Sequence, residues 1–385
     1  MSKINDLIKE MCPNGVIYKK ISDVSEFVQG FAFENSKFTD CGESIVRTTN
    51  IQNGKISEES MVCFNLNDYN CNLDKYKIIK DRIIIGMSGT IKVARNMTDK
   101  IYYLNQRVGM FIPKLNIDND FLYHVLNNSV EILLNMTSGS AVKNLSSKDI
   151  NSFKIPVPPL EVQKEIAKIL DKFGELEAEL EAELEARKRQ YEFWRDQLLS
   201  DGGSNKSLSE VAKVYRGKRV VKKDLEADID NDLFPVFQNS LTPLGYFSEH
   251  NCPGDTTYII SAGAAGEIGY AEDCFWAADD CLICECNKEI RSKYLYYLLK
   301  NNQSYIKTQV RKASVPRLSK SVIEGIKFTL PSILEQDRII DILNKFDKLI
   351  NDIDVGIPAE IELRRKQYEY YRNKLLSFEE LSVNE

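Results

Sequence analysis

The 385-residue sequence has little of the chemistry that most enzymes need. It contains only two histidines, His124 and His250, and His124 stands in an apolar stretch, so we expect a structural role for that ring. Neither a serine nucleophile elbow nor a Gly-x-Gly-x-x-Gly fingerprint is present. An Asn-Pro-Pro-Tyr sequence, which adenine methyltransferases carry, is also missing. These absences argue against a catalytic chain.

Two motifs approach a nucleotide or metal site without completing one. Residues 263–266 (Gly-Ala-Ala-Gly) lack the Gly-Lys-Ser/Thr ending of a phosphate loop and are followed by acidic residues. Cys281, Cys284 and Cys286, with Cys274 nearby, lack a second pair at zinc-finger spacing, so we expect buried thiols rather than a metal site. No cofactor is expected, and a nucleotide- or metal-using enzyme is the weakest of three hypotheses.

Long apolar runs are missing as well. No stretch approaches the ~20 residues of a membrane-spanning helix. Residues 1–15 contain no apolar signal core, so we expect a cytoplasmic protein whose nine cysteines stay reduced. Hydrophobic residues make up 43% and charged residues 28% of the chain, which is typical of globular domains. The length predicts two or three of them.

The formal net charge is −6, from 51 basic and 57 acidic residues, and that total argues against a nucleic-acid partner. Its distribution along the chain changes this interpretation. Residues 156–200 and 329–385 each carry a net charge of −4, whereas residues 1–155 carry +2 and residues 201–328 are neutral. The excess acid therefore belongs to the two segments that we predict to be helical.

The chain contains an internal repeat, which places two similar halves one after the other. The matching pairs are residues 169–173 with 342–346, Gln163 with Gln336, Leu145 with Leu318, and residues 187–192 with 364–369. Sequence numbers differ by 173 in the first three pairs, which we call the repeat offset, and by 177 in the last. The second copy has therefore gained four residues. We expect a duplication with an approximate two-fold axis, a geometry that suits duplex DNA.

Each half ends in a long amphipathic helix. The first is predicted to follow Pro158-Pro159 and to end near residue 200, before a Gly- and Ser-rich break. The second is predicted to begin at Ser332, where Glu335 completes a capping-box pattern, and Pro358 should kink or interrupt it. A single apolar stripe needs a partner, so we expect the helices to pair as an antiparallel coiled coil.

Three identical tetrapeptides, Glu-Leu-Glu-Ala, run from Glu175 to Ala186 in the first helix. A step of four slightly overshoots the 3.6-residue turn, so Leu176, Leu180 and Leu184 drift but stay near one face. The pattern fits a solvated acidic helix. It also fits a spacer of ~6 Å per tetrapeptide that sets the distance between the globular regions.

The remaining segments are predicted to be two α+β domains. The predicted strands are residues 76–79, 82–85, 108–112, 257–260 and 281–286, and the predicted helices are residues 121–134 and 294–299. Segments of ~140 residues can bury adequate cores. The predicted divisions are a globular domain (1–155), a helix (156–200), a second globular domain (201–328), and a second helix with a tail (329–385).

Basic residues in the globular segments stand beside amide and hydroxyl side chains. Arginine can donate two hydrogen bonds to guanine and Asn or Gln can pair with adenine, while Lys, Ser and backbone N–H groups more often hold phosphates. One such residue alone is usually a solvated charge, but a set in both halves favours DNA contact. The candidate DNA-contacting residues are Arg47, Thr49, Asn50, Lys92, Arg95, Asn105, Gln106, Arg107, Lys143, Arg216, Lys218, Arg219, Gln238, Asn239, Arg311, Lys312, Ser314 and Arg317.

Several segments together resemble the specificity (S) subunits of type I restriction-modification systems. The segments are residues 138–140 (Ser-Gly-Ser), 144–145 (Asn-Leu), 155–166 (Ile-Pro-Val-Pro-Pro-Leu-Glu-Val-Gln-Lys-Glu-Ile), 189–199 and 330–377. Residues 189–199 look like the end of the central conserved helix of that family, and residues 330–377 look like its distal conserved helix. The resemblance spans nearly the whole chain, and the joint pattern is more specific than any single motif.

The resemblance implies that each globular region is a target recognition domain reading one half of a split DNA site. It implies that the helices separate the two domains and dock two adenine-N6 methyltransferase subunits, and that motor–nuclease subunits complete the restriction complex. A specificity subunit itself catalyses nothing. In this family the tetrapeptides of the central helix are associated with the length of the unspecified gap, and residues 175–186 lie in that place.

Two features depart from the family pattern. The distal helix lacks the tetrapeptides and contains Pro358, and the second globular region has more cysteine and acid than the first. The alternative function is a coiled-coil scaffold that binds proteins without DNA specificity. Under the leading hypothesis, replacing Arg47 or Arg311 by alanine should weaken one half-site only.

Overall fold

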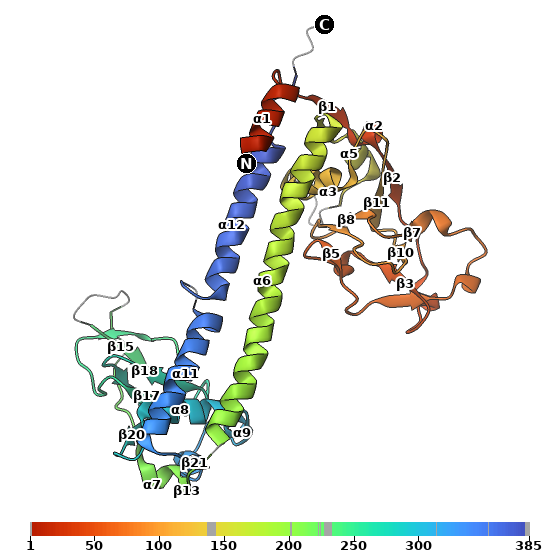
Figure 1. Cartoon of the computed structure of the whole chain (residues 1–385). Helices are drawn as coiled ribbons and strands as arrows, with labels where there is room; N and C mark the ends of the chain where they lie inside the picture. The colour runs from red at the N-terminus through yellow and green to blue at the C-terminus, as the bar shows by residue number, and fades with distance from the viewer. Residues whose placement is uncertain are drawn as a thin grey trace. The chain divides into compact units, whose positions relative to one another are not determined.

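The structure is a computed structural model in which the chain forms two compact units. The described residues are 2–136, 144–200, 202–221, 223, 225–226, 233–312, 314–352 and 354–381. One unit comprises residues 1–179 and 361–385, and the other comprises residues 180–360. Each unit joins one globular region to a part of the long helices, as Figure 1 shows. None of the described helices is long and apolar enough to cross a membrane.

Two sheets form the body of the first globular region. Their strands are β2 (Ser25–Gln29), β3 (Glu43–Val46), β4 (Ile51–Gln52), β5 (Lys55–Ile56), β6 (Val62–Phe64), β7 (Lys77–Ile78), β8 (Ile83–Gly86), β9 (Val93–Arg95), β10 (Tyr102–Leu104) and β11 (Val108–Pro113). The orders are β6-β3-β10-β7 and β2-β11-β8-β9-β5-β4. Alternate side chains of β8 enter different cores, Ile83 and Ile85 on one face and Ile84 on the other, so this strand is buried throughout.

Short helices and a strand pair connect these sheets to the long helices. They are α1 (Ser2–Met11), β1 (Ile17–Lys20), α2 (Ile21–Val24), α3 (Asn119–Asn128), α4 (Val130–Met136), α5 (Ser147–Ser152) and β12 (Lys154–Val157), with β1 antiparallel to β12. Asp118 caps α3 by accepting from the amides of Asp120 and Phe121. The helix expected at residues 121–134 is two helices, because the chain breaks at Ser129.

The first part of α6 (Leu160–Ser200) packs antiparallel against α12 (Ile357–Leu376) within the first unit. The Phe173 ring lies 5.5 Å from that of Tyr371, and one turn further along α6 the Glu177 carboxylate pairs with Arg365 at 2.6 Å. Between these two contacts the residue number rises along α6 and falls along α12, so the two helices run antiparallel.

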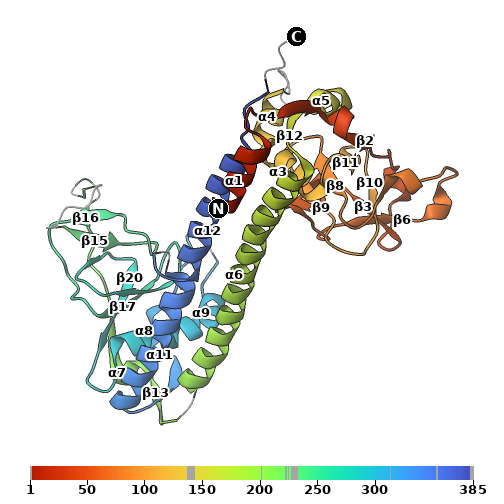
Figure 2. The ribbon, with the colours of Figure 1, turned by 45° about the horizontal axis from the view of Figure 1, so that its top comes forward.

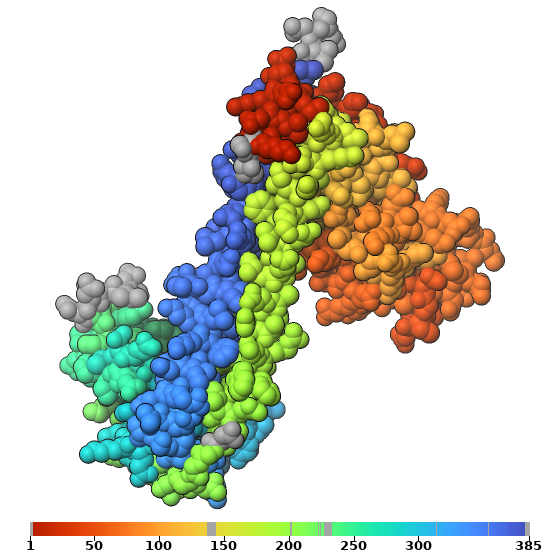
Figure 3. Space-filling view, in the orientation of Figure 1, coloured from red at the N-terminus to blue at the C-terminus, as the bar shows by residue number. Residues whose placement is uncertain are grey.

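The two ends of the chain lie together in the first unit. Ile4 of α1 shares a buried cluster with Leu375 and Leu376, and Figure 3 shows α1 packed over this end of the helices. The Val16 amide donates to the Glu379 carbonyl at 2.9 Å, and the Tyr18 hydroxyl donates to the backbone of Phe378 at 3.0 Å. The C-terminal segment is thus bound to the first globular region.

The second globular region repeats the architecture in a smaller form. Its strands are β13 (Ser204–Ser207), β14 (Ala212–Arg216), β15 (Phe234–Phe237), β16 (Gly245–Phe247), β17 (Thr256–Ile260), β18 (Ile268–Ala271), β19 (Trp276–Ala277), β20 (Cys281–Cys286) and β21 (Lys327–Leu330). The orders are β13-β21, β14-β20-β17-β18 and β16-β15-β19. The predicted strands in both regions are confirmed by β7, β8, β11, β17 and β20.

Helices cover one face of the β14-β20-β17-β18 sheet of the second globular region. They are α7 (Leu208–Val211), α8 (Ser292–Asn301), α9 (Gln303–Thr308), α10 (Lys320–Glu324) and α11 (Ile333–Asn351). Helix α8 packs on β17 and β18 and also contacts α11, so it lies between sheet and long helix (Figure 2). Leu198 and Leu199 of α6 join Ile339 of α11 in one cluster, and Tyr191 lies 6.1 Å from Phe346, again antiparallel.

The distal helix is interrupted before α12 begins, and Pro358 does not cause the break. Helix α11 ends at Asn351, and the Asp352 carboxylate accepts from the amides of Asp354 and Val355. Pro358 lies in the first turn of α12, where proline is tolerated. At the start of α11, the Ser332 hydroxyl accepts from the Glu335 amide as expected.

The duplication extends to individual hydrogen bonds. Gln163 is fully buried, accepts from the Asp118 amide at 2.8 Å and donates to the backbone of Pro158. Gln336, its match at the repeat offset, is also fully buried, accepts from the Arg291 amide at 2.9 Å and donates to Pro331. Buried amides with equivalent partners fix where each globular region meets its long helix.

Candidate nucleic-acid interface

Four loops of the first globular region meet at one edge of its sheets. We call residues 29–31, 46–49, 86–92 and 104–108 edge 1. The Gly30 amide donates to Val108, the Asn105 amide donates to Val46, and the Met87 amide donates to Arg107, at 2.8–3.2 Å. The Leu145 amide in turn donates to Met87 at 2.9 Å. Backbone hydrogen bonds therefore hold segments that are far apart in sequence in one place.

Most side chains of edge 1 that the sequence singled out are accessible. Thr49, Lys92, Gln106 and Arg107 are exposed, and Asn105 is half-buried. The edge therefore offers a guanidinium, an ammonium and two amides, the groups that donate to guanine, to phosphate and to adenine. Gln29, whose side chain donates to the Gln106 carbonyl at 3.3 Å, belongs to the same surface.

The second globular region has a matching edge. We call residues 216–218, 237–239, 261–266, 278–281, 311–312 and 314–318 edge 2. The Gly217 amide donates to Cys281, the Ser261 amide donates to Asp280, and the Leu318 amide donates to Ser261, at 2.7–3.1 Å. The Ala264 amide donates to Asn239 at 2.9 Å, so the glycine-containing loop is held against the loop after β15.

Edge 2 gathers most of the candidate residues of its region. The exposed members are Arg216, Lys218, Asn239, Arg311, Lys312, Ser314 and Arg317, while Gln238 is half-buried. Arg216 donates to the Asp279 carbonyl at 3.2 Å and approaches the Ser261 hydroxyl at 3.4 Å. Arg311 and Arg317 pair through their backbones, which places two exposed cations side by side. Arg219 is exposed just beyond this edge.

The two edges are built by the same backbone hydrogen bonds but carry different side chains. Met87 and Ser261 hold equivalent positions, because each accepts from the amide of a leucine, and these leucines, Leu145 and Leu318, match in the repeat. Gly89 and Gly263, two residues further along, both have positive φ, which glycine adopts without strain. A shared backbone with variable side chains is the arrangement that recognition of different sequences needs.

The equivalence reveals residues that sequence reasoning missed. Gln106 and Arg107 of edge 1 correspond to Asp279 and Asp280 of edge 2 at the repeat offset. A carboxylate accepts hydrogen bonds, for example from the amino group of cytosine. Reasoning confined to basic and amide residues could not find the aspartates, although the repeat offset could have done so.

Three candidate residues, Arg47, Asn50 and Arg95, are partly or fully buried and make internal contacts, and one lies outside the described residues. Asn50 is 1% exposed, and its side chain donates to the carbonyls of Ser57 and Glu59. Arg47 is half-buried and donates to the Ser60 carbonyl at 2.8 Å. We remove Asn50 from the candidate DNA contacts because its amide is already satisfied within the fold. Lys143 lies outside the described residues.

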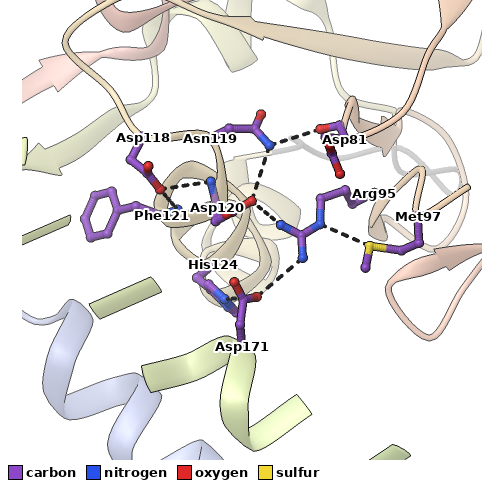
Figure 4. A network of polar contacts seen from close by, with 9 residues as sticks. All are labelled: Asp81, Arg95, Met97, Asp118, Asn119, Asp120, Phe121, His124 and Asp171. Atoms are coloured by element: carbon purple, nitrogen blue, oxygen red, sulfur yellow. Dashed lines mark hydrogen bonds and ion pairs between the residues drawn. The ribbon is translucent and has the colours of Figure 1, made fainter. Parts of the chain in front are cut away.

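Arg95 is the second residue to be removed, because its guanidinium is held in an internal network (Figure 4). It forms ion pairs with Asp120 of α3 and, at 3.4 Å, with Asp171 of α6, and its side chain is 11% exposed. Burial alone would raise the pKa of Asp171, but the hydrogen bond with His124 and the nearby Arg95 charge lower it below its ordinary value. His124 thus has the structural role expected from its apolar surroundings.

Of the cysteines that the sequence predicted to be buried, Cys281 and Cys284 of β20 are buried, while Cys286 and Cys274 are half-buried. Burial raises the pKa of Cys281 and of Cys286 to about 12, and it also raises the pKa of Cys284, so these thiols stay protonated near neutral pH. Within the described part of the chain, no group of three His, Cys, Asp or Glu side chains could hold a metal ion.

Fold and edges together define a duplicated α/β protein in which each copy presents one variable loop edge. The chain belongs to the family described as the type I restriction modification DNA specificity domain, whose model matches residues 13–186 and again residues 202–363. The family predicted from the sequence is thereby confirmed, and the two matches coincide with the two halves of the repeat.

Relatives of known description agree. A putative type I specificity subunit of Mycoplasma pneumoniae is 33% identical over 63% of this chain and 93% of its own length. A putative type I restriction enzyme specificity subunit of Haemophilus influenzae is 31% identical over 72% of this chain and 77% of its own length. The Escherichia coli EcoR124I/EcoR124II specificity subunit is 34% identical over 62% of this chain and 65% of its own length.

Solved structures share the fold. The S subunit of a type I restriction-modification system from M. genitalium has a TM-score of 0.61 at 19% identity and covers 94% of this chain and 96% of its own. A chain from a structural study of complex assembly and conformational transition in the type I R-M system has a TM-score of 0.62 at 13% identity, with coverages of 95% and 98%. The predicted architecture of two α/β regions with long helices is thus confirmed.

Proposed function

We propose that this chain is the DNA-reading subunit of a type I restriction-modification complex, and that edge 1 and edge 2 each read one half of a split site. One observation carries the proposal: equivalent backbone hydrogen bonds hold equivalent loops in both regions, while the exposed side chains differ. Two half-sites of unrelated sequence need two readers of common geometry and different chemistry.

The chemistry of the edges suggests what each would prefer. Edge 1 presents Arg107, Gln106 and Lys92, which donate to base edges or phosphates. Edge 2 combines Arg216 and the Arg311/Arg317 pair with carboxylates, so it can both donate to and accept from bases. The half-site read by edge 1 (half-site 1) is therefore proposed to be rich in bases that accept hydrogen bonds. The half-site read by edge 2 (half-site 2) is proposed to include at least one base amino group.

The long helices are proposed to dock two adenine-N6 methyltransferase subunits, and motor–nuclease subunits would complete the complex. Phe193 and Trp194 of α6 are 57% and 41% exposed, and Leu363 and Tyr370 of α12 are 60% and 61% exposed. These exposed side chains are the proposed docking residues, since apolar patches on a helix surface favour protein binding. The chain itself is proposed to be non-catalytic, in line with the specificity subunits to which it is related.

The tetrapeptide segment is proposed to set the gap between the half-sites. Helix α6 is continuous through residues 175–186, so each tetrapeptide adds ~6 Å of helix. Leu176, Leu180 and Leu184 are half-buried, and the intervening glutamates are mostly exposed. A length set by copy number can change without any change in the recognition edges.

The deciding experiment is co-expression with a type I methyltransferase subunit, followed by sequencing of N6-methyladenine in host DNA. We expect methylation at one split motif with the pair and none with this chain alone. Methylation by the chain alone would show that it is catalytic. An assembled complex that methylates no defined motif would instead favour the scaffold without DNA specificity.

A further inference from the structure

Each globular region meets its own long helix at an equivalent junction. In the first unit His124 of α3 bonds Asp171 of α6, with 3.0 Å between His124 Nε2 and the carboxylate. In the second unit the Tyr297 hydroxyl of α8 donates to Asn344 of α11 at 2.7 Å. The two pairs match each other at the repeat offset. The junctions therefore share their geometry while their side chains differ.

A partly buried cation occupies the first junction. Arg95 comes from strand β9, and its guanidinium lies 5.1 Å from the centre of the Tyr123 ring. It pairs with Asp120 of α3 and with Asp171 of α6, so one side chain connects the sheet, the domain helix and the long helix (Figure 4).

A partly buried cation lies beside the second junction as well, but it comes from helix α8, and its contacts join α8 to the β18 region. The Lys293 ammonium of α8 lies 3.8 Å from the centre of the Tyr270 ring and 5.4 Å from that of Tyr296. Its side chain is 19% exposed, and the Glu272 carboxylate is 3.8 Å away. Burial lowers the pKa of Lys293, as expected for an ammonium withdrawn from water.

The cation comes from a strand in the first unit and from a helix in the second. Lys293 stands where the first unit has Asp120, and Tyr296 where it has Tyr123, both at the repeat offset. On the strand, Arg95 pairs with Ile83 of β8 and Tyr270 pairs with Thr257 of β17, which are matching register positions. In both units a cation therefore lies near the equivalent tyrosine, Tyr123 or Tyr296. In the first unit the strand supplies this cation, and in the second unit the helix supplies it.

We propose that this partly buried cation is a positioning element that sets the base-pair gap the subunit accepts. Arg95 fixes the first globular region directly on α6. Lys293 fixes α8 against its sheet, and α8 in turn bonds α11 through Tyr297. The proposal rests on the proposed function, because it concerns where each edge is held while DNA is read. A cation bound to a carboxylate and an aromatic face at once tolerates few orientations of the elements that carry them. Arg95 and Lys293 are positioning residues, since neither belongs to the proposed DNA-contacting set.

The internal swap supplies its own test. In Arg95→Tyr the carboxylates of Asp120 and Asp171 lose their cation, and in Asp120→Lys two cations crowd one site. The double variant Arg95→Tyr/Asp120→Lys reproduces the strand tyrosine and the helix lysine of the second unit. Lys55→Ala, which removes an exposed lysine from neighbouring strand β5, is the matched control.

Each variant, assembled with its methyltransferase subunits, is assayed on DNA carrying the wild-type gap and gaps one base pair shorter or longer. We expect the single variants to lose about 10- to 100-fold in methylation rate on the wild-type gap, the order expected for a ~1 Å misplacement. They should also lose discrimination between the gaps. The double variant should recover both within about threefold, and Lys55→Ala should behave as wild type.

Thermal unfolding of the same variants separates positioning from stability. Single variants that lower the rate on all gaps equally, in step with a lower Tm, would overturn the proposal, as would a double variant no better than either single one. Unchanged gap discrimination in folded single variants would overturn it too. A wild-type complex with no defined motif would instead contradict the proposed function.

Discussion

Arg107 and Asp280 hold the same backbone position in the two globular regions, yet one donates hydrogen bonds and the other accepts them. The Met87 amide donates to the first and the Ser261 amide to the second, so the difference lies in the side chains alone. We therefore propose that recognition chemistry is decided residue by residue on a shared backbone.

Replacing Arg107 by alanine should weaken recognition of half-site 1 and leave half-site 2 unchanged. If Arg107 makes a bidentate base contact, the loss should be about 1–3 kcal/mol and should relax specificity at one base pair. Binding of the assembled complex to a panel of single-base variants measures this, with Lys55→Ala as the control. An equal loss on every sequence would mark Arg107 as a phosphate contact.

Asp171 gives the first unit a defined sensitivity to acid. Burial opposes its ionisation, but the His124 hydrogen bond and the Arg95 charge hold its pKa below the ordinary 3.8. A carboxyl whose pKa is lowered in the folded state stabilises the fold at any pH above its ordinary pKa. This stability is lost as the pH falls through the lowered pKa. Asp171→Asn should therefore lower the Tm at pH 6, and the difference from wild type should shrink as the pH approaches 3.

Thermal scans of both proteins between pH 6 and pH 3 measure this difference. Asp68→Asn, which changes an exposed carboxylate, should follow the wild-type curve at every pH. A deficit in Asp171→Asn that stays constant over this range would show that its charge does not matter.

At the scale of elements, the helical periodicity was sufficient to predict both long helices, and α6 begins directly after Pro159 as expected. The sequence predicts an interruption at Pro358, but the break between α11 and α12 lies before Ile357, where α12 starts. A proline in the first turn of a helix is compatible with both an ending and a beginning. The Asp352 side chain, which binds two amides beyond the helix end, decides where the break lies.

Deletion of residues 183–186 should shorten the recognised gap and leave both half-sites unchanged. It removes one tetrapeptide, so α6 shortens by ~6 Å and its two parts rotate by ~40° relative to each other. Methylation sequencing with the partner subunit reads the new motif directly. Glu183→Gln/Glu185→Gln keeps the length while removing the same charge, and it should keep the wild-type gap. Changed half-site bases in the deletion variant would contradict the spacer role.

At the scale of the whole molecule, net charge separates two kinds of surface. The helical segments carry −8 against a total of −6, and the two globular segments together carry +2. Phosphate neutralisation drives most non-specific DNA affinity, and a nearly neutral pair of regions can supply little of it. Partner subunits are therefore expected to contribute much of the binding free energy.

The isolated chain should bind DNA weakly and with a shallow salt dependence, whereas its complex with methyltransferase subunits should bind tightly. Fluorescence anisotropy between 50 and 200 mM salt measures both, and the slope of log K against log salt should be steeper for the complex. If the isolated chain had the same affinity and the same salt slope as the complex, its own cations would be sufficient to neutralise the phosphates.

The sequence by itself determined the duplication, the long helices and the family, because repeated residues and apolar periodicity are local or translational patterns. Most of the candidate DNA-contacting residues that it singled out are exposed at the two edges, and their contact with DNA stays a prediction. Tertiary structure alone decided that Asn50 and Arg95 face inward, because hydrogen-bond partners from distant strands and helices satisfy them. The sequence likewise could not show that Lys293 of a helix takes the place of Arg95 of a strand. Only strand register and helix packing bring each cation close to its tyrosine.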